Sequence, residues 1–152
     1  MASIRPGDSA SDAAPRGVGR HDRAGSPRIA LIERDPRVSD LASHFLTRAG
    51  FAVQVVADSV HAFEQVRASI PTLVITEILM PGLDGLSLCR RLKADPVTRA
   101  VRVLILSMLS AQARASEAGA DGFLRKPISE AGLVAAVTAV LAGFEPGRPV
   151  DG

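Results

Sequence analysis

The chain has 152 residues, which is enough for one domain with a buried core and rarely for two. Hydrophobic residues make up 47% of it, with no tryptophan or tyrosine. This composition suits an aliphatic core and argues against recognition of single-stranded nucleic acid by base stacking. The formal net charge is only +2, so a DNA-binding role would rest on the basic pI alone, which an arginine-bearing tail explains equally well.

The two ends of the chain differ from the middle. Residues 1–27 are rich in Gly, Ala, Ser, Pro, Asp and Arg, and we expect this segment to be disordered because it has little surface to bury. Residues 144–152 are expected to form a loose tail, which leaves a domain at 28–143. No apolar run approaches a membrane-spanning length, and the N-terminus lacks the apolar core of a signal peptide, so we expect a cytoplasmic protein with no membrane partner.

Five short apolar runs alternate with five segments of helical periodicity. Strands are predicted at Arg28–Ile32, Phe51–Val56, Leu73–Thr76, Val101–Leu106 and Asp121–Leu124. Helices are predicted from Pro36 to Ala49, from Asp58 or Ser59 to Ile70, and at Gly85–Ala94, Ala111–Ala118 and Glu130–Leu141. Asp35 and Asp84 are the expected N-caps of the first and third helices. The inner face of the second helix is expected to hold Ala62, Phe63, Val66 and Ile70.

This alternation predicts an α/β fold, a doubly wound, five-stranded parallel sheet with helices on both faces. Right-handed crossovers and short loops favour the flavodoxin-like (βα)5 strand order 2-1-3-4-5. In that order several strand ends meet at one edge of the sheet. We therefore expect Glu33 and Arg34, Glu77, Ser107 and Lys126 to lie on one rim.

Two segments carry a resemblance to a known family. Residues 80–85 (Met-Pro-Gly-Leu-Asp-Gly) follow the third strand, and residues 119–127 (Gly-Ala-Asp-Gly-Phe-Leu-Arg-Lys-Pro) cover the fifth. From Ile29 to Leu141 the chain resembles the receiver domain of two-component response regulators. Such receivers take a phosphoryl group from a histidine kinase onto an aspartate, with a Mg²⁺ ion held beside it.

The resemblance implies a role for each matching position. Lys126 matches the lysine that contacts the phosphoryl group, and its bond to Pro127 is expected to be cis. Ser107 matches the hydroxyl that makes a second phosphoryl contact, and Phe123 the aromatic residue that moves with it. Glu33 matches the first of two metal-binding acids. The segment between Ser107 and the fifth strand is about one helical turn shorter than the family pattern, which shortens the helix there and leaves any dimer geometry open.

Two positions depart from the family pattern. Glu77 stands where the phosphorylated aspartate belongs, and its carboxylate lies one methylene, roughly 1.5 Å, further from the backbone. Misplacing a reacting group by about 1 Å can lower the rate of phosphoryl transfer a hundredfold. Its charge instead comes near the place of the phosphoryl oxygens, within reach of Lys126 and Ser107. Arg34 occupies the second metal-ligand position, and a guanidinium repels Mg²⁺. We expect the Mg²⁺ site to be lost and Arg34 to pair with Glu33 and with Glu77.

An alternative for Arg34 stays open, in which its side chain points to solvent and Asp35 partly replaces the lost ligand.

Taken together, these residues predict a stand-alone, atypical pseudo-receiver that is not an enzyme, has no catalytic residue and needs no cofactor. It would signal through contact with a protein such as a histidine kinase or a downstream effector, with no nucleic acid partner. The alternative is a phosphorylatable, Mg²⁺-dependent regulator. A flavin-binding protein of the same topology is a distant third, since no phosphate-cradling loop follows the first strand.

Overall fold

The computed structural model describes residues 25–143. The expectations for the two chain ends fall outside these residues, except at positions 25–27. Five strands form one parallel sheet in the order β2-β1-β3-β4-β5, as predicted. The strands are β1 Arg28–Ile32, β2 Ala52–Val56, β3 Leu73–Thr76, β4 Arg102–Ser107 and β5 Gly122–Arg125. The helices are α2 Pro36–Arg48, α3 Ala62–Ser69, α4 Gly85–Ala94, α5 Gln112–Glu117 and α6 Glu130–Ala142, with a 3-10 turn at Ser59–His61 before α3.

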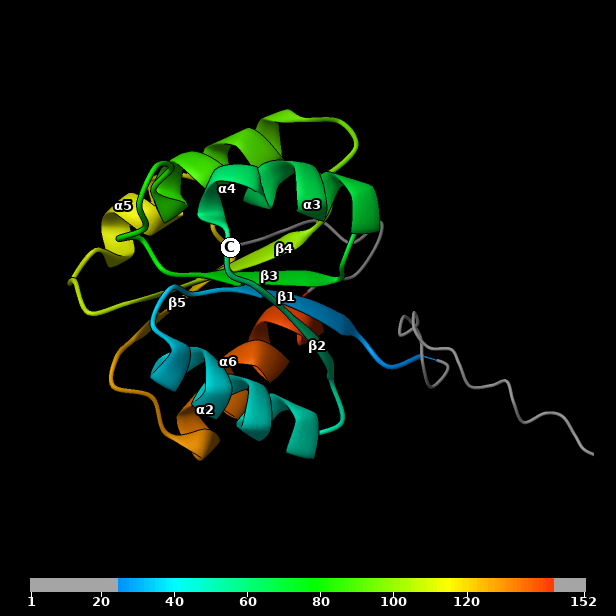
Figure 1. Ribbon diagram of the computed structural model, residues 1–152, viewed down its shortest axis with the longest axis vertical. Coiled ribbons are helices and arrows are strands. Elements are labelled where there is room, and N and C mark those ends of the chain that lie inside the picture. The colour runs from blue at the N-terminus through cyan, green and yellow to red at the C-terminus, as the bar shows by residue number, and fades with distance from the viewer. Residues whose placement is uncertain (1–24, 144–152) are drawn as a thin grey trace, which may run out of the picture.

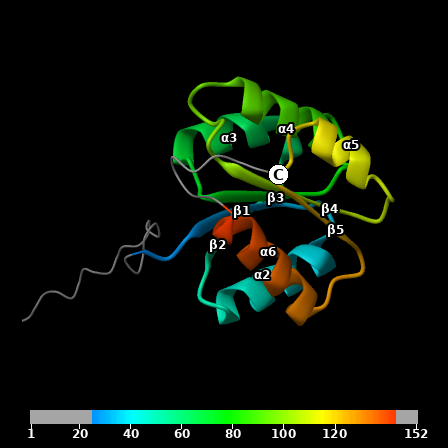
Figure 2. The same cartoon turned by 180° about the vertical axis from the view of Figure 1, so that it is seen from behind.

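The helices form a layer on each face of the sheet. Figure 1 shows α3, α4 and α5 on one face and α2 and α6 on the other, and Figure 2 shows the same division from behind. Between residues 25 and 143 no helix is both long and apolar enough to cross a bilayer.

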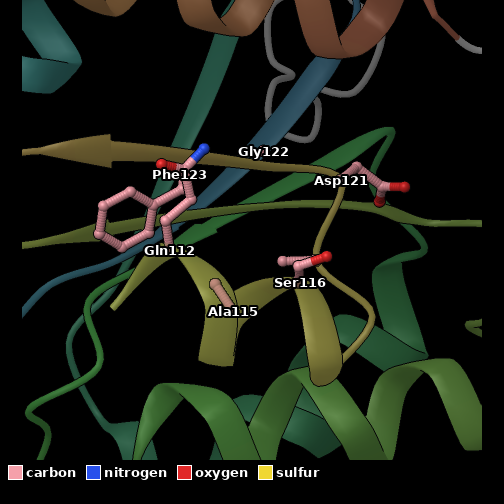
Figure 3. Close-up of a pocket in the computed structure, with 7 residues that line it drawn as sticks. Gln112, Ala115, Ser116, Asp121, Gly122 and Phe123 are labelled. Atoms are coloured by element: carbon pink, nitrogen blue, oxygen red, sulfur yellow. The ribbon is translucent and has the colours of Figure 1, made fainter. Parts of the chain in front are cut away.

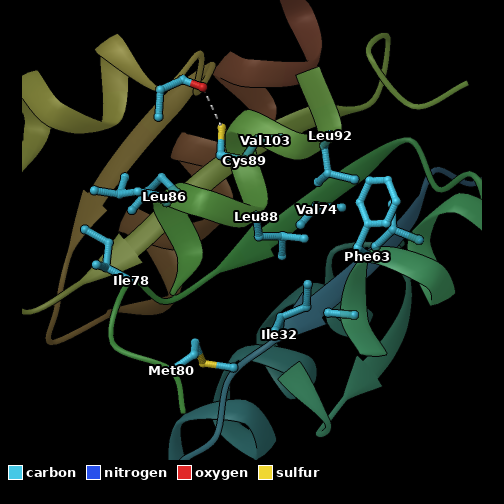
Figure 4. Close-up of a cluster of buried hydrophobic side chains, with 14 of the residues drawn as sticks. Ile32, Phe63, Val74, Ile78, Met80, Leu86, Leu88, Cys89, Leu92 and Val103 are labelled. Carbon is cyan, nitrogen blue, oxygen red and sulfur yellow. Dashed lines mark hydrogen bonds between the residues drawn. The ribbon is translucent and has the colours of Figure 1, made fainter. Parts of the chain in front are cut away.

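Each face of the sheet has its own apolar core, because side chains alternate between the two faces of a strand. On the α3–α4–α5 side, Ile32, Phe63, Val74, Leu86 and Cys89 belong to one cluster (Figure 4). Cys89, the only cysteine of the sequence, is buried, and its Sγ donates to the Ala118 carbonyl at 3.3 Å. Burial raises the pKa of its thiol to about 11, so this cysteine is unreactive near neutral pH.

Local sequence signals explain where the helices begin. Asp35 caps α2 by accepting the Arg37 N–H at 3.0 Å, with Pro36 at the first helical position. Asp84 caps α4 by accepting the Ser87 N–H at 2.9 Å. Both caps confirm the sequence prediction, and both stand at the carboxyl end of a strand, where they fix the loops that carry the candidate site.

One core assignment was wrong. Ile70 does not lie on the inner face of α3; it follows the helix with a left-handed φ of 46° and is 40% exposed. Its N–H still donates to the Val66 carbonyl, so it ends the helix as an αL cap. Pro71 disfavours helical geometry in the residue before it, and this is why Ile70 leaves the helix.

Candidate functional site

The register of the sheet brings the expected residues to one rim. Ile32 pairs with Thr76 across β1 and β3, so Glu33 and Glu77 are the next residues on neighbouring strands. Ser107 pairs with Arg125 across β4 and β5, so Lys126 comes directly beyond Ser107. Since all these strands are parallel, the four chain segments leave the sheet at the same edge.

The Lys126 ammonium joins the two glutamates. Its Nζ lies 2.8 Å from Glu33 Oε1 and 2.7 Å from Glu77 Oε1. The side chains of Glu33 and Glu77 are only 2% and 5% exposed, and that of Lys126 is 12% exposed. Two buried carboxylates therefore share one nearly buried cation, an arrangement in which each charge depends on its partner.

The remaining carboxylate oxygens bind backbone N–H groups of the loops that follow each strand. Glu33 Oε2 accepts the Asp35 N–H at 3.0 Å, and Glu77 Oε2 accepts the Leu79 N–H at 2.9 Å. Each glutamate thus folds back on its own loop with one oxygen and reaches Lys126 with the other. The extra methylene of glutamate, relative to aspartate, allows this double reach.

The charges of the pair stabilise one another. Burial, the strongest single influence on Glu77, acts to raise its pKa, but hydrogen bonds from Lys126, the Leu79 N–H and the Ser107 hydroxyl together hold the pKa of Glu77 below its ordinary value. Burial also opposes the charged form of Lys126, yet Glu33 and Glu77 raise the pKa of Lys126 above its ordinary value. Glu77 and Lys126 are therefore both charged at neutral pH.

Ser107 is fully buried beside this pair. Its Oγ accepts the Leu109 N–H at 3.2 Å, and its carbonyl accepts the Lys126 N–H at 2.9 Å. The hydroxyl proton remains available as a donor, in agreement with the effect of Ser107 on the pKa of Glu77. The expected meeting of Glu77, Lys126 and Ser107 is present in the structure.

Phe123 and Pro127 occupy the positions expected of them around this site. Phe123 is partly buried and packs against the apolar cluster on the α3–α4–α5 side of the sheet. The peptide bond between Lys126 and Pro127 is cis, as the resemblance implied.

The expected pairing of Arg34 was not found. Arg34 is exposed, and within residues 25–143 it forms no ion pair with a carboxylate; Lys126 takes that place beside Glu33 and Glu77. The physical reason is the cost of desolvation: a guanidinium buried at this rim would be a fourth desolvated charge, beside Glu33, Glu77 and Lys126. The open alternative, a solvent-facing Arg34, agrees with the structure.

A magnesium ion prefers near-octahedral oxygen ligands, usually one or two carboxylates with several waters. The residues at this rim do not fit that set, because the Lys126 ammonium already contacts both Glu33 and Glu77 and the Arg34 side chain offers no oxygen. Each Oε2 atom accepts a backbone N–H, and Glu33 Oε1 is buried with Lys126 as its ion-pair partner but without a hydrogen bond. The Asp35 carboxylate uses Oδ1 to cap α2. Among the described residues, no group of three or more His, Cys, Asp or Glu side chains is placed to hold a metal ion.

The turn after β3 is built tightly around Glu77. The Gly85 N–H donates to the Ile78 carbonyl at 2.9 Å, and a Cβ on Gly85 would collide with the Glu77 carbonyl oxygen. Gly82 has a φ of 86°, and a Cβ there would lie 2.8 Å from Val60. Gly85 is therefore needed because the loop packs against the Glu77 backbone, and Gly82 because its φ is positive.

Two features around β5 were not foreseen from the sequence. A cavity of about 160 Å³ lies between α5 and β5, with the Phe123 ring near one end and Asp121 near the other (Figure 3). It accompanies the short α5, which has only six residues. Arg125 also donates from Nε to the Met108 carbonyl at 3.1 Å, and nothing in the local sequence signals this contact.

The two histidines among the described residues lie elsewhere. His44 and His61 are both exposed. His61 Nδ1 lies 2.6 Å from Asp58 Oδ2 in the loop after β2, and this contact raises the pKa of His61. The pair belongs to the start of α3 and not to the site around Lys126.

Comparison with known proteins decides the family. A sequence model described as the response regulator receiver domain matches residues 29–138. The chain belongs to this family. It is therefore a receiver domain of the two-component response regulator type, and the flavodoxin-like topology is the fold of that family.

Individual relatives agree with this assignment. The chain is 35% identical over 127 residues to transcriptional regulatory protein CseB of Streptomyces coelicolor, covering 80% of this chain and 52% of CseB. It is 42% identical over 120 residues to transcriptional activator protein PfeR of Pseudomonas aeruginosa, covering 76% of this chain and 38% of PfeR. The crystal structure of a LuxR-family two-component response regulator from Aurantimonas sp. matches with a TM-score of 0.70 and 32% identity, covering 78% of this chain and 86% of that one.

The chain matches only about half, or less, of the length of these curated relatives. Their names identify them as transcriptional regulators, so the expectation that nucleic acid is not a partner finds no support in the comparisons. Similarity to these relatives does not show what Glu77 at the acceptor position or Arg34 at the metal-ligand position does.

Proposed function

We propose that this receiver signals in a two-component pathway through contact with a protein partner, without Mg²⁺-dependent aspartyl phosphorylation. In this proposal Glu77 supplies permanently the negative charge that phosphorylation would supply transiently. A histidine kinase or a downstream effector is the proposed class of partner, and the cytoplasm the proposed location. The observation that carries the proposal is the buried ion pair of the Glu77 carboxylate with Lys126 at 2.7 Å.

The chemistry of the rim supports the absence of phosphoryl transfer. A nucleophilic carboxylate needs a free oxygen in line with the incoming phosphorus atom. Both oxygens of Glu77 already accept, one from Lys126 and one from the Leu79 N–H. Arg34 at the second metal-ligand position removes the carboxylate that a magnesium ion would need.

In this proposal Glu77 also biases the domain toward the active-like conformer, the one that phosphorylation favours in receivers of this family. A fixed charge shifts a two-state equilibrium only if it interacts better with one state than with the other. The side chains that bind Glu77 are those of Lys126 and Ser107, beside the Leu79 N–H, and the Lys126 N–H also donates to the Ser107 carbonyl. The charge of Glu77 therefore favours the conformer in which Ser107 faces it.

The proposal is tested by removing that charge without changing the size of the side chain. In Glu77→Gln, we expect large changes in the backbone amide chemical shifts of Ser107, Leu109 and Phe123. Glu64→Gln, which makes the same chemical change at an exposed position of α3, serves as the matched control and should leave those shifts unchanged. If Glu77→Gln alters only its immediate neighbours and leaves Phe123 and Leu109 unmoved, Glu77 does not set the conformation of the switch residues.

A further inference from the structure

The end of β5 also holds the loop after β4. The side chain of Arg125, the last residue of β5, reaches this loop, where its Nε donates to the Met108 carbonyl at 3.1 Å. The residue after β5 holds the end of β4 through its backbone, since the Lys126 N–H donates to the Ser107 carbonyl at 2.9 Å. Arg125 and Lys126 therefore contact two consecutive carbonyl groups, at the end of β4 and at the start of the β4–α5 connection.

The contact made by Arg125 falls on a particular peptide unit. The Met108 carbonyl and the Leu109 N–H belong to one planar peptide group, and they point in opposite directions because the peptide is trans. Arg125 contacts the carbonyl end of this group, and Ser107 Oγ accepts from its N–H end at 3.2 Å. Fixing the carbonyl therefore fixes the direction in which the N–H points.

Few other hydrogen bonds hold this loop. The Met108 side chain is 65% exposed, whereas the Leu109 side chain packs against the apolar cluster on the α3–α4–α5 side. The helix that follows is only six residues long, and Ala111 at its N-cap position gives no side-chain capping bond. Within the described residues, the hydrogen bonds of the Met108–Leu109 peptide are those made with Arg125 and with Ser107.

We propose that Arg125 is a positioning residue, a latch that orients the Met108–Leu109 peptide so that Ser107 Oγ accepts from Leu109 and directs its own hydroxyl proton to Glu77. The inference rests on the proposed function only in taking Glu77 as the charge that Ser107 serves. Arginine suits this role because its guanidinium keeps its charge and donates in a fixed plane. A hydrogen bond from a charged donor is stronger than one between neutral groups.

The latch is tested by hydrogen exchange at the Leu109 amide in Arg125→Ala. We expect exchange to be about tenfold faster than in the unmodified protein, the factor that corresponds to about 1.4 kcal/mol. Arg114→Ala removes the same charge from an exposed position of α5 and should leave Leu109 unchanged. Arg125→Lys keeps the charge and a donor, and should restore part of the protection.

A second measurement is the pKa of Glu77, obtained by carboxyl carbon NMR. This pKa should rise in Arg125→Ala because the Ser107 hydroxyl is no longer directed to the Glu77 carboxylate. Loss of a positive charge would itself raise that pKa slightly, so the change is repeated in a Ser107→Ala background. There the latch has nothing to position, and the additional effect of Arg125→Ala should be largely lost.

Leu109 exchange within twofold of the unmodified protein in a folded Arg125→Ala variant would overturn the inference. An effect on the Glu77 pKa that is the same with and without Ser107 would also overturn it, because it would mark a purely electrostatic influence. These measurements use no phosphodonor and no partner. They can therefore fail while the proposed function holds, and they can succeed even if Glu77 proves to accept phosphate.

Discussion

Replacing Lys126 by methionine removes the one cation that, within residues 25–143, forms ion pairs with the two buried glutamates, and keeps the length of the side chain. Both Oε1 atoms lie within 2.8 Å of the same nitrogen, so they face each other directly once the ammonium is gone. At an effective dielectric of about 20, two carboxylates about 5 Å apart repel by about 3 kcal/mol. Removing one partner of a buried ion pair costs about 3–5 kcal/mol in measured cases. We expect Lys126→Met to lower the free energy of unfolding by about 3–5 kcal/mol at pH 7.

The assay is urea-induced unfolding at pH 7 and pH 5. The loss should shrink at the lower pH, because in this variant a carboxyl that has lost its cation takes up a proton more readily. Lys93→Met is the control: Lys93 lies 3.0 Å from Asp121 and also donates to the Val101 carbonyl at 2.8 Å, but Asp121 keeps Arg102 at 2.9 Å, so its carboxylate is not left without a cation. We expect a loss of only about 1–2 kcal/mol there, for one ion pair and one hydrogen bond. Equal losses for the two variants would refute the argument that Glu33 and Glu77 depend on Lys126.

Three further predictions concern pH and the backbone. Because the folded pKa of Glu77 is lowered from 4.5, its contribution to stability is complete above that pH and is lost as pH falls through the lowered value. Glu77→Gln should therefore flatten the acid limb of a curve of stability against pH, and an unchanged acid limb would contradict this. At the alkaline end, the folded pKa of Lys126 is raised from 10.5, so its contribution to stability is complete below that pH and is lost as pH rises through the raised value. Ile70→Gly should be more stable to urea than Ile70→Ala by about 1 kcal/mol, since only glycine adopts the left-handed conformation without strain, and the reverse order would exclude strain at this cap. Gly85→Ala should cost about 1–3 kcal/mol in thermal unfolding because its Cβ meets the Glu77 carbonyl, and a neutral result would show that the turn can shift.

Local patterns were sufficient to predict the sheet and the meeting of the site residues. β1 and β3 are short apolar runs that end at acids, and the alternation of strands and helices allows few topologies. Once the strand order is known, Glu33, Glu77, Ser107 and Lys126 must share a rim. This part of the site was predictable because it follows from the backbone.

The side-chain partners were less predictable, because they depend on competition among nearby groups. The sequence places both Arg34 and Lys126 near two carboxylates, and spacing alone cannot decide which cation is buried. The structure has Lys126 in that position and Arg34 exposed. Ile70 was wrongly assigned to the core for a similar reason: helical periodicity continues to that residue, but the following proline ends the helix.

The most direct test of the account is the intact mass of the protein after incubation with acetyl phosphate, with and without Mg²⁺. A Glu77→Asp, Arg34→Asp double variant, which restores the family pattern at both positions, serves as the positive control. We predict that only the double variant gains the mass of a phosphoryl group, and that it does so in a Mg²⁺-dependent way. A Mg²⁺-dependent gain of that mass by the unmodified protein would contradict the proposal that Glu77 and Arg34 have replaced phosphorylation.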